Sequence, residues 1–353
     1  MSEQFCDVGR GVTLCYETFG ERSDPTALLI MGLGTQMLAW QPDFCERLAA
    51  RGLHVVRFDN RDVGRSTHLD GRPPTVAQLL TRSRRAAHYT LADMAEDAAG
   101  LLRELELAPA HVIGASMGGM IAQTLAAREP RLVRSLTSIM SNTGSRLNGQ
   151  PSLRVYPIFL RRAPHGRAAF VAHMERVFAA IGSRGLPQDV DDLRAIAALS
   201  YERDHDPAGP GRQLAAILAA GNRTAELRRI SAPTLVIHGG ADPLVAPSGG
   251  RATARAIRGA RLMMIDGMGH DLPRAAWPRL IDAIATHARS AEERAGGPAS
   301  SAAMDSAGGP ASSAASTSHA AGVNALATTA TASASANGNG RLSLPARPPT
   351  RAG

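Results

Sequence analysis

Short apolar runs alternate along the chain with longer segments in which apolar residues recur every three or four positions. The short runs predict buried strands, and the longer segments predict helices with one apolar face. This alternation indicates an α/β fold with an eight-stranded, mostly parallel sheet and crossover helices. The predicted strands span 12–19, 27–31, 54–59, 111–115, 135–140, 234–238 and 261–265, after an antiparallel first strand near 5–8.

Two predicted helices carry a clear apolar face. Thr90 is expected to cap the first, with Asp93 three residues further on, and Pro109 prevents the helix from running into the next strand. The single apolar face of each helix predicts packing against the sheet. The residues concerned are Leu91, Met94, Ala98, Leu101, Leu102 and Leu105 in the first helix, and Trp277, Leu280, Ile281 and Ile284 in a closing helix.

The stretch between the strands ending near Met140 and starting at Thr234 is too long for a simple crossover, because such connections are usually short. It contains helical patterns at 168–181, 189–200 and 213–220. We therefore predict an α/β core of residues 1–141 and 228–290, and a helical cap of residues 142–227 over one edge of the sheet. Five apolar residues of this cap either line a pocket or pack the cap against itself: Leu153, Ile158, Phe159, Phe170 and Phe178.

From residue 291 the composition changes to Ala, Ser, Gly, Thr and Pro, and the segment 296–303 recurs intact at 308–315. Such a chain buries too little apolar surface to offset the conformational entropy that it would lose on folding. Residues 291–353 are therefore predicted to form a disordered, low-complexity tail.

Charge, cysteine content and hydropathy narrow the class of protein. The net charge of +8 comes from arginines scattered among 31 acidic residues, a pattern that predicts no nucleic-acid partner. There is no apolar run of membrane-spanning length and no secretory signal pattern, so a cytoplasmic protein without a membrane span is expected. Cys6, Cys15 and Cys45 lack metal-ligand spacing and are expected to be reduced, with no metal bound.

The strongest chemical signal is the segment Gly114-Ala115-Ser116-Met117-Gly118, which lies between a predicted strand and a predicted helix. A serine on so sharp a turn points outward, and glycines on either side let strand and helix approach closely. The alternative is an ordinary small-residue loop. Because a strand precedes the motif and a helix follows it, we favour Ser116 as a catalytic nucleophile.

A serine needs a base within hydrogen-bond reach and a third group that orients the base. His270 follows the last predicted strand in a glycine-rich loop, and Asp242 follows the strand before it. The order Ser116, Asp242, His270 is the one expected for an α/β-hydrolase triad. Asp266 and Asp271 lie too close to His270 in sequence to reach its ring, and Asp59 and Asp62 are interpreted as partners of arginines that brace their loop.

An oxyanion hole requires two backbone N–H donors. Met117 supplies one at the start of the predicted helix, and Leu33, in the turn after the strand 27–31, is expected to supply the second. The alternative for Leu33 is a plain glycine-rich turn.

These residues together resemble the α/β-hydrolase superfamily, and more closely bacterial esterases of the aclacinomycin methylesterase type. The likeness rests on the segments 29–32, 39–40, 58–67, 116–120, 232–243 and 267–270. It implies a serine hydrolase without a cofactor and with a helical cap between the sixth and seventh strands.

The expected reaction is hydrolysis of a small-molecule carboxylic ester whose apolar part lies under the cap. Thioesterase, acyltransferase, C–C bond hydrolase and perhydrolase chemistry remain alternatives on the same triad. A receptor that reuses the pocket without catalysis is a further alternative.

Overall fold

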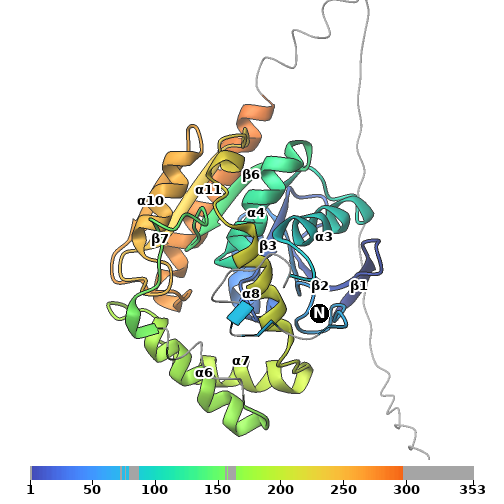
Figure 1. Cartoon of the computed structure of the whole chain (residues 1–353). Coiled ribbons are helices and arrows are strands. Elements are labelled where there is room, and N and C mark those ends of the chain that lie inside the picture. The colour runs from blue at the N-terminus through green and yellow to red at the C-terminus, as the bar shows by residue number, and fades with distance from the viewer. Residues whose placement is uncertain are drawn as a thin grey trace, which may run out of the picture. The chain divides into compact units, whose positions relative to one another are not determined.

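The computed structural model describes residues 2–71, 74–75, 77–78, 87–155, 157 and 164–296. Its centre is an eight-stranded sheet in the order β1-β2-β4-β3-β5-β6-β7-β8 (Figure 1). The strands are β1 Gln4–Asp7, β2 Thr13–Phe19, β3 Thr26–Ile30, β4 His54–Phe58, β5 Ala110–Ala115, β6 Val133–Ile139, β7 Thr234–Gly239 and β8 Arg261–Ile265.

The pairing of the strands matches the prediction. β1 pairs antiparallel with β2, and β2 pairs antiparallel with β4. All other pairs, from β4 through β3 and β5 to β8, are parallel. The carboxyl ends of β3, β5, β7 and β8 therefore lie along the same edge of the sheet, where open α/β sheets place their ligands and catalytic groups. The predicted fold class is confirmed.

The central strands are buried on both faces, which explains why they are continuous apolar runs rather than alternating ones. In β3, Leu28 and Ile30 belong to one buried cluster, whereas Ala27 and Leu29 belong to another. Successive strand side chains point to opposite faces, so a run of apolar residues supplies both cores at once.

Helices cover both faces. Side chains of α1 and α11 complete the cluster on one face, and side chains of α3 and α4 complete the other. The helices are α1 Pro42–Ala49, α3 Leu91–Glu104, α4 Met117–Arg128, α6 Arg167–Ile181, α7 Val190–Arg203, α8 Gly209–Ala220, α9 Thr224–Leu227, α10 Pro247–Ala256 and α11 Trp277–Ala295. Short 3-10 turns are η1 Met37–Ala39, η3 Pro130–Leu132, η4 Leu153–Val155 and η5 Arg274–Ala276.

Local sequence explains several of these boundaries. Thr90 caps α3 through a reciprocal box, in which its side chain accepts from the Asp93 N–H and Asp93 accepts from the Thr90 N–H. The starts of α1 and α10 were not predicted, although each has a proline in its first turn. The sequence of α10 is not typical of a helix, because it contains Gly249-Gly250 and glycine has a poor helix propensity.

The predicted cap region contains α6, α7, α8 and α9, all between β6 and β7. In Figure 1, α6 and α7 lie at the lower side of the molecule, and α8 lies between them and the sheet. The Phe170 ring of α6 contacts the rings of Tyr201 and His205, tilted against the first and edge-on to the second, so it packs α6 against the end of α7. Leu153 is exposed, whereas Ile158 and Phe159 lie outside the described residues. The division into core and cap stays a prediction.

The core does not end at Ser290 as predicted, because α11 continues to Ala295. Ala291 is buried, and the Glu292 carboxylate lies 3.0 Å from the Arg134 guanidinium. The composition of residues 291–295 suits a helix, and the change to low complexity begins only at Gly296. The remainder of the predicted tail, 297–353, lies outside the described residues.

Two other expectations concern the cysteines and membrane-spanning segments. All three cysteines are free, as predicted, and all three are buried. Within the described ranges, no helix has the length and apolar character needed to cross a membrane.

The end of α11 gives a first testable prediction. A chain ending at Ser290 should melt at a lower temperature than a chain ending at Gly296, because it loses the buried Ala291 and the pair between Glu292 and Arg134. A loss of about 1 kcal/mol would lower Tm by roughly 2–4 °C in differential scanning calorimetry. Equal melting temperatures for the two chains would show that 291–295 contribute nothing to folding.

Candidate active site

Ser116 lies on the turn between β5 and α4, with a positive φ of 56° and ψ of −118°. Non-glycine residues rarely adopt this conformation, which costs about 1–3 kcal/mol and persists only where the surroundings enforce it. Gly114 and Gly118 make the turn possible. A Cβ on Gly114 would lie 2.1 Å from the Gly118 carbonyl oxygen, and a Cβ on Gly118 would lie 2.1 Å from the Ile30 carbonyl oxygen.

His270 follows β8 and meets the serine at the carboxyl edge of the sheet. Its Nε2 atom lies 2.9 Å from the Ser116 Oγ, and its Nδ1 atom lies 2.7 Å from Asp242 Oδ2. A carboxylate only accepts, so Nδ1 carries the proton and Nε2 is free to accept from the serine hydroxyl. The three predicted residues form a continuous hydrogen-bonded chain.

Asp242 follows β7 and is held by more than the histidine. Its Oδ1 atom accepts from the backbone N–H groups of Leu244 and Val245, both at 2.9 Å. The residue is only 4% exposed, yet its carboxylate has three N–H donors when His270 is included. Such donors stabilise a buried charge that burial alone would disfavour.

Sequence reasoning missed His238, which lies on β7 four residues before Asp242. The His238 Nε2 atom lies 2.8 Å from the Val245 carbonyl oxygen and 3.6 Å from Asp242 Oδ2. Burial lowers the pKa of His238, so the ring is neutral at neutral pH. It therefore braces the loop that carries Asp242. Its place at the carboxyl end of a strand was the signal that could have found it.

The two predicted oxyanion donors lie beside the serine. Gly32, directly before Leu33, is so close that a Cβ there would lie 3.2 Å from the Ser116 Cβ. Met117 is the first residue of α4, where backbone N–H groups lack a partner within the helix. Within the described ranges, neither the Leu33 nor the Met117 N–H donates a hydrogen bond.

The prediction that Asp59 and Asp62 pair with arginines is confirmed, and the arginines come from the inserted helices. Arg203 of α7 lies 2.6 Å from Asp59, and Arg212 of α8 lies 2.7 Å from Asp62. In addition, the Gln213 side chain accepts from the Gly34 N–H at 2.8 Å, one residue beyond Leu33. These contacts attach α7 and α8 to loops at the carboxyl edge of the sheet.

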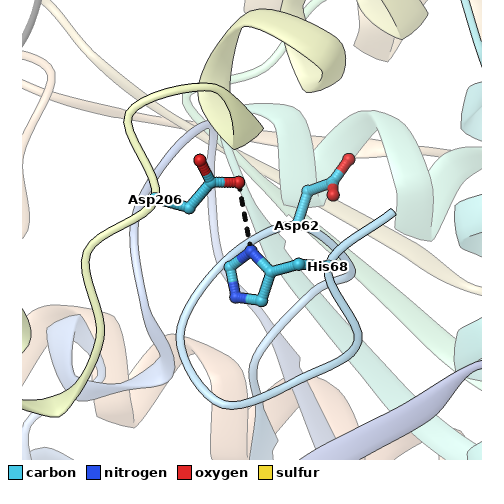
Figure 2. A group of neighbouring side chains, drawn as sticks. All are labelled: Asp62, His68 and Asp206. Carbon is cyan, nitrogen blue, oxygen red and sulfur yellow. Dashed lines mark hydrogen bonds and ion pairs between the residues drawn. The ribbon is translucent and has the colours of Figure 1, made fainter. Parts of the chain in front are cut away.

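The group most like a metal site is Asp62, His68 and Asp206, whose ligand atoms lie within 4.8 Å of one another (Figure 2). The His68 Nδ1 atom lies 3.2 Å from Asp206. However, the Arg212 guanidinium already bridges Asp62 and Asp206 at 2.7 and 2.8 Å. A guanidinium supplies the positive charge that a metal would bring, so we interpret the group as an ion-pair network.

A strand–serine–helix turn with a histidine and an aspartate at the same sheet edge defines an α/β hydrolase. The family described as the alpha/beta hydrolase fold matches residues 25–273, and the chain belongs to it. It is similar to a rhodomycin D methylesterase from Streptomyces peucetius, with 30% identity over 300 residues that cover 79% of this chain and 96% of the relative.

Two further similar proteins are a second methylesterase and a hydrolase of known structure. A rhodomycin D methylesterase from another Streptomyces is 31% identical over 300 residues, again 79% of this chain and 96% of the relative. A solved hydrolase structure from Pseudomonas aeruginosa has a TM-score of 0.59 at 24% identity, covering 82% of this chain and 97% of that one. The first two confirm the predicted resemblance to esterases of the aclacinomycin methylesterase type, and the third shows the same fold.

The network of Figure 2 gives a pH-dependent prediction. Burial alone would lower the pKa of His68, but hydrogen bonds with Gly64 and Asp206 and the charges of Asp204 and Asp206 raise it above 6.5. The protonated ring therefore stabilises the folded state below about pH 6.5, and this contribution is lost as pH rises through the raised pKa.

Urea unfolding of wild type and His68→Gln over a range of pH would measure this contribution. The wild type should be more stable at low pH, and the difference in stability should shrink as the pH rises through the raised pKa of His68. A difference that stays constant or grows with pH would contradict the ion-pair assignment.

Proposed function

We propose that the protein is a serine hydrolase that cleaves a small-molecule carboxylic ester through an acyl-enzyme. The observation that carries this proposal is the chain of hydrogen bonds from Ser116 through His270 to Asp242, at 2.9 and 2.7 Å. Nucleophile, base and orienting carboxylate at these distances match the arrangement needed for acyl transfer.

Acylation begins when His270 Nε2 takes the proton from the Ser116 hydroxyl and the serine oxygen attacks the ester carbonyl carbon. The Asp242 carboxylate holds the imidazole in the correct tautomer and stabilises the imidazolium that forms. Because Asp242 is buried and already bonded to two backbone N–H groups, it keeps its orientation during the step.

The tetrahedral oxyanion is stabilised by the N–H groups of Leu33 and Met117, with the positive end of the α4 dipole behind them. His270 then gives its proton to the leaving alcohol, and the C–O bond breaks. In the second half, His270 removes a proton from water, the hydroxide attacks the acyl carbon, and the acid leaves as the Ser116 hydroxyl is restored.

The relatives favour an ester as the substrate. Both Streptomyces relatives are named as methylesterases. We therefore propose methyl esters of carboxylic acids with an apolar part as the first substrates to test, with that part held between the sheet edge and α6–α8. Thioesters and lactones of the same acids form the comparison set, since one triad supports several acyl transfers.

Fluorophosphonate labelling tests the nucleophile and base. Wild type should be labelled at Ser116 and should hydrolyse short-chain nitrophenyl and methyl esters. Ser116→Ala should give no adduct, and His270→Ala should lose turnover because no other group reaches the serine hydroxyl within hydrogen-bond distance in the described ranges. An unlabelled wild type would favour a receptor, and turnover retained by either variant would remove that residue from the mechanism.

Asp242→Asn tests the orienting carboxylate. An amide placed at Oδ2 would present a donor to His270 Nδ1 and favour the wrong tautomer, so kcat should fall by about 10⁴-fold. Folding should change little, because the remaining oxygen can still accept from Leu244 and Val245. Steady-state kinetics and a melting curve measure the two effects, and an unchanged kcat would point to another carboxylate.

A further inference from the structure

The loop that carries His270 is bound directly to the end of α6. The His270 backbone N–H donates to the Ile181 carbonyl oxygen at 2.8 Å, where α6 ends. The Gly185 N–H donates to the Gly267 carbonyl oxygen at 3.1 Å. The backbones also touch: a Cβ on Gly269 would lie 2.3 Å from the Gly182 carbonyl carbon. Residues 181–185 and 267–271 therefore form one packed unit.

Ser183 links the residues on either side of His270. Its hydroxyl accepts from the Gly269 N–H at 2.9 Å and donates to Asp271 Oδ1 at 2.5 Å. The Ser183 backbone N–H donates to the same Asp271 oxygen at 2.9 Å. Ser183 is only 4% exposed, so water does not compete for these bonds. Because the His270 N–H also bonds to Ile181, the three consecutive residues Gly269, His270 and Asp271 are all hydrogen-bonded to residues 181–183.

Asp271 does not replace Asp242 as the partner of the imidazole. The His270 Nδ1 atom bonds Asp242, whereas Asp271 Oδ1 takes both Ser183 donors. The two carboxylates next to the histidine thus have separate tasks. One orients the ring, and the other fixes the backbone from which the ring projects.

We propose that Ser183 and Asp271 are positioning residues for His270, and that through them the end of α6 sets the distance between the imidazole and the Ser116 hydroxyl. The proposal rests on the base role proposed for His270. A general base must keep its nitrogen within hydrogen-bond reach of the nucleophile, and a misplacement of about 1 Å can reduce a rate by about 100-fold.

This arrangement makes the inserted helices part of the catalytic geometry. His270 lies on a loop that contains Gly267 and Gly269, and the Ser183–Asp271 hydrogen bond connects this loop to the residues directly after α6. A substrate contact that shifts α6 would therefore shift the base. A segment that only covered the site would have no such effect.

Kinetics of Ser183→Ala, Asp271→Ala and Asp271→Asn test the proposal. Ser183→Ala and Asp271→Ala should lower kcat and the rate of fluorophosphonate labelling by about 10- to 100-fold, with KM changed by less than about twofold. Asp271→Asn keeps an oxygen that accepts from Ser183 and should retain most of kcat, which a general packing role for the site would not predict.

Ser135→Ala is the matched control. Ser135 is also a buried serine with one side-chain partner, His111 at 2.8 Å, and it lies on β6 away from the triad. The melting temperature of this variant should fall about as much as that of Ser183→Ala, but its kcat should stay at the wild-type value. Equal kcat losses in Ser135→Ala and Ser183→Ala, or wild-type kcat in Ser183→Ala, would overturn the positioning role.

The outcomes separate this inference from the proposed function. A wild type that is labelled and active, with a fully active Ser183→Ala, would overturn the positioning role alone. A wild type with neither label nor turnover would overturn both. If Ser183→Ala does not fold, the comparison of Asp271→Asn with Asp271→Ala decides: equal kcat values in those two variants would overturn the proposal.

Discussion

The close contact of β3, β5 and α4 around Ser116 is the constraint on which the site depends. The positive φ of Ser116 is maintained because the backbones at Gly114, Gly118 and Ile30 leave no room for another path. This crowding has two consequences. It turns the hydroxyl out of the sheet, and it brings the Gly32 loop and the start of α4 to the same point. The same close packing of β3, β5 and α4 therefore positions both Ser116 and the backbone N–H groups beside it.

Buried polar contacts then attach the inserted helices to this edge. Arg203 and Arg212 reach Asp59 and Asp62 from α7 and α8, and Ser183 reaches Asp271 from the end of α6. Breaking one member of such a buried pair leaves an uncompensated charge, at a cost of about 3–5 kcal/mol. The helices are therefore fixed in position by specific partners, not by apolar packing alone.

Much of the fold and of the candidate site could be predicted, because the sequence patterns that indicate them are local. Apolar runs marked the strands, the capping residues marked α3, and Ser116, Asp242 and His270 each stood in the turn or loop that follows a strand. The end of α11 was misplaced because residues 291–295 contain no large apolar residue, although Ala, Glu and Arg all favour a helix. The roles proposed for the three residues rest on the distances between them, which no local pattern contains.

The sequence by itself determined the α/β order, the serine turn and the candidate residues, since each depends on neighbours within a few positions. Only the tertiary structure decided which carboxylate meets His270 and what supports its loop. Asp242 is 28 positions away from His270, and Ser183 is 88 positions away from Asp271. Partners so distant are chosen by how strands and helices pack, and in isolation Ser183 is an ordinary serine in a glycine-rich loop.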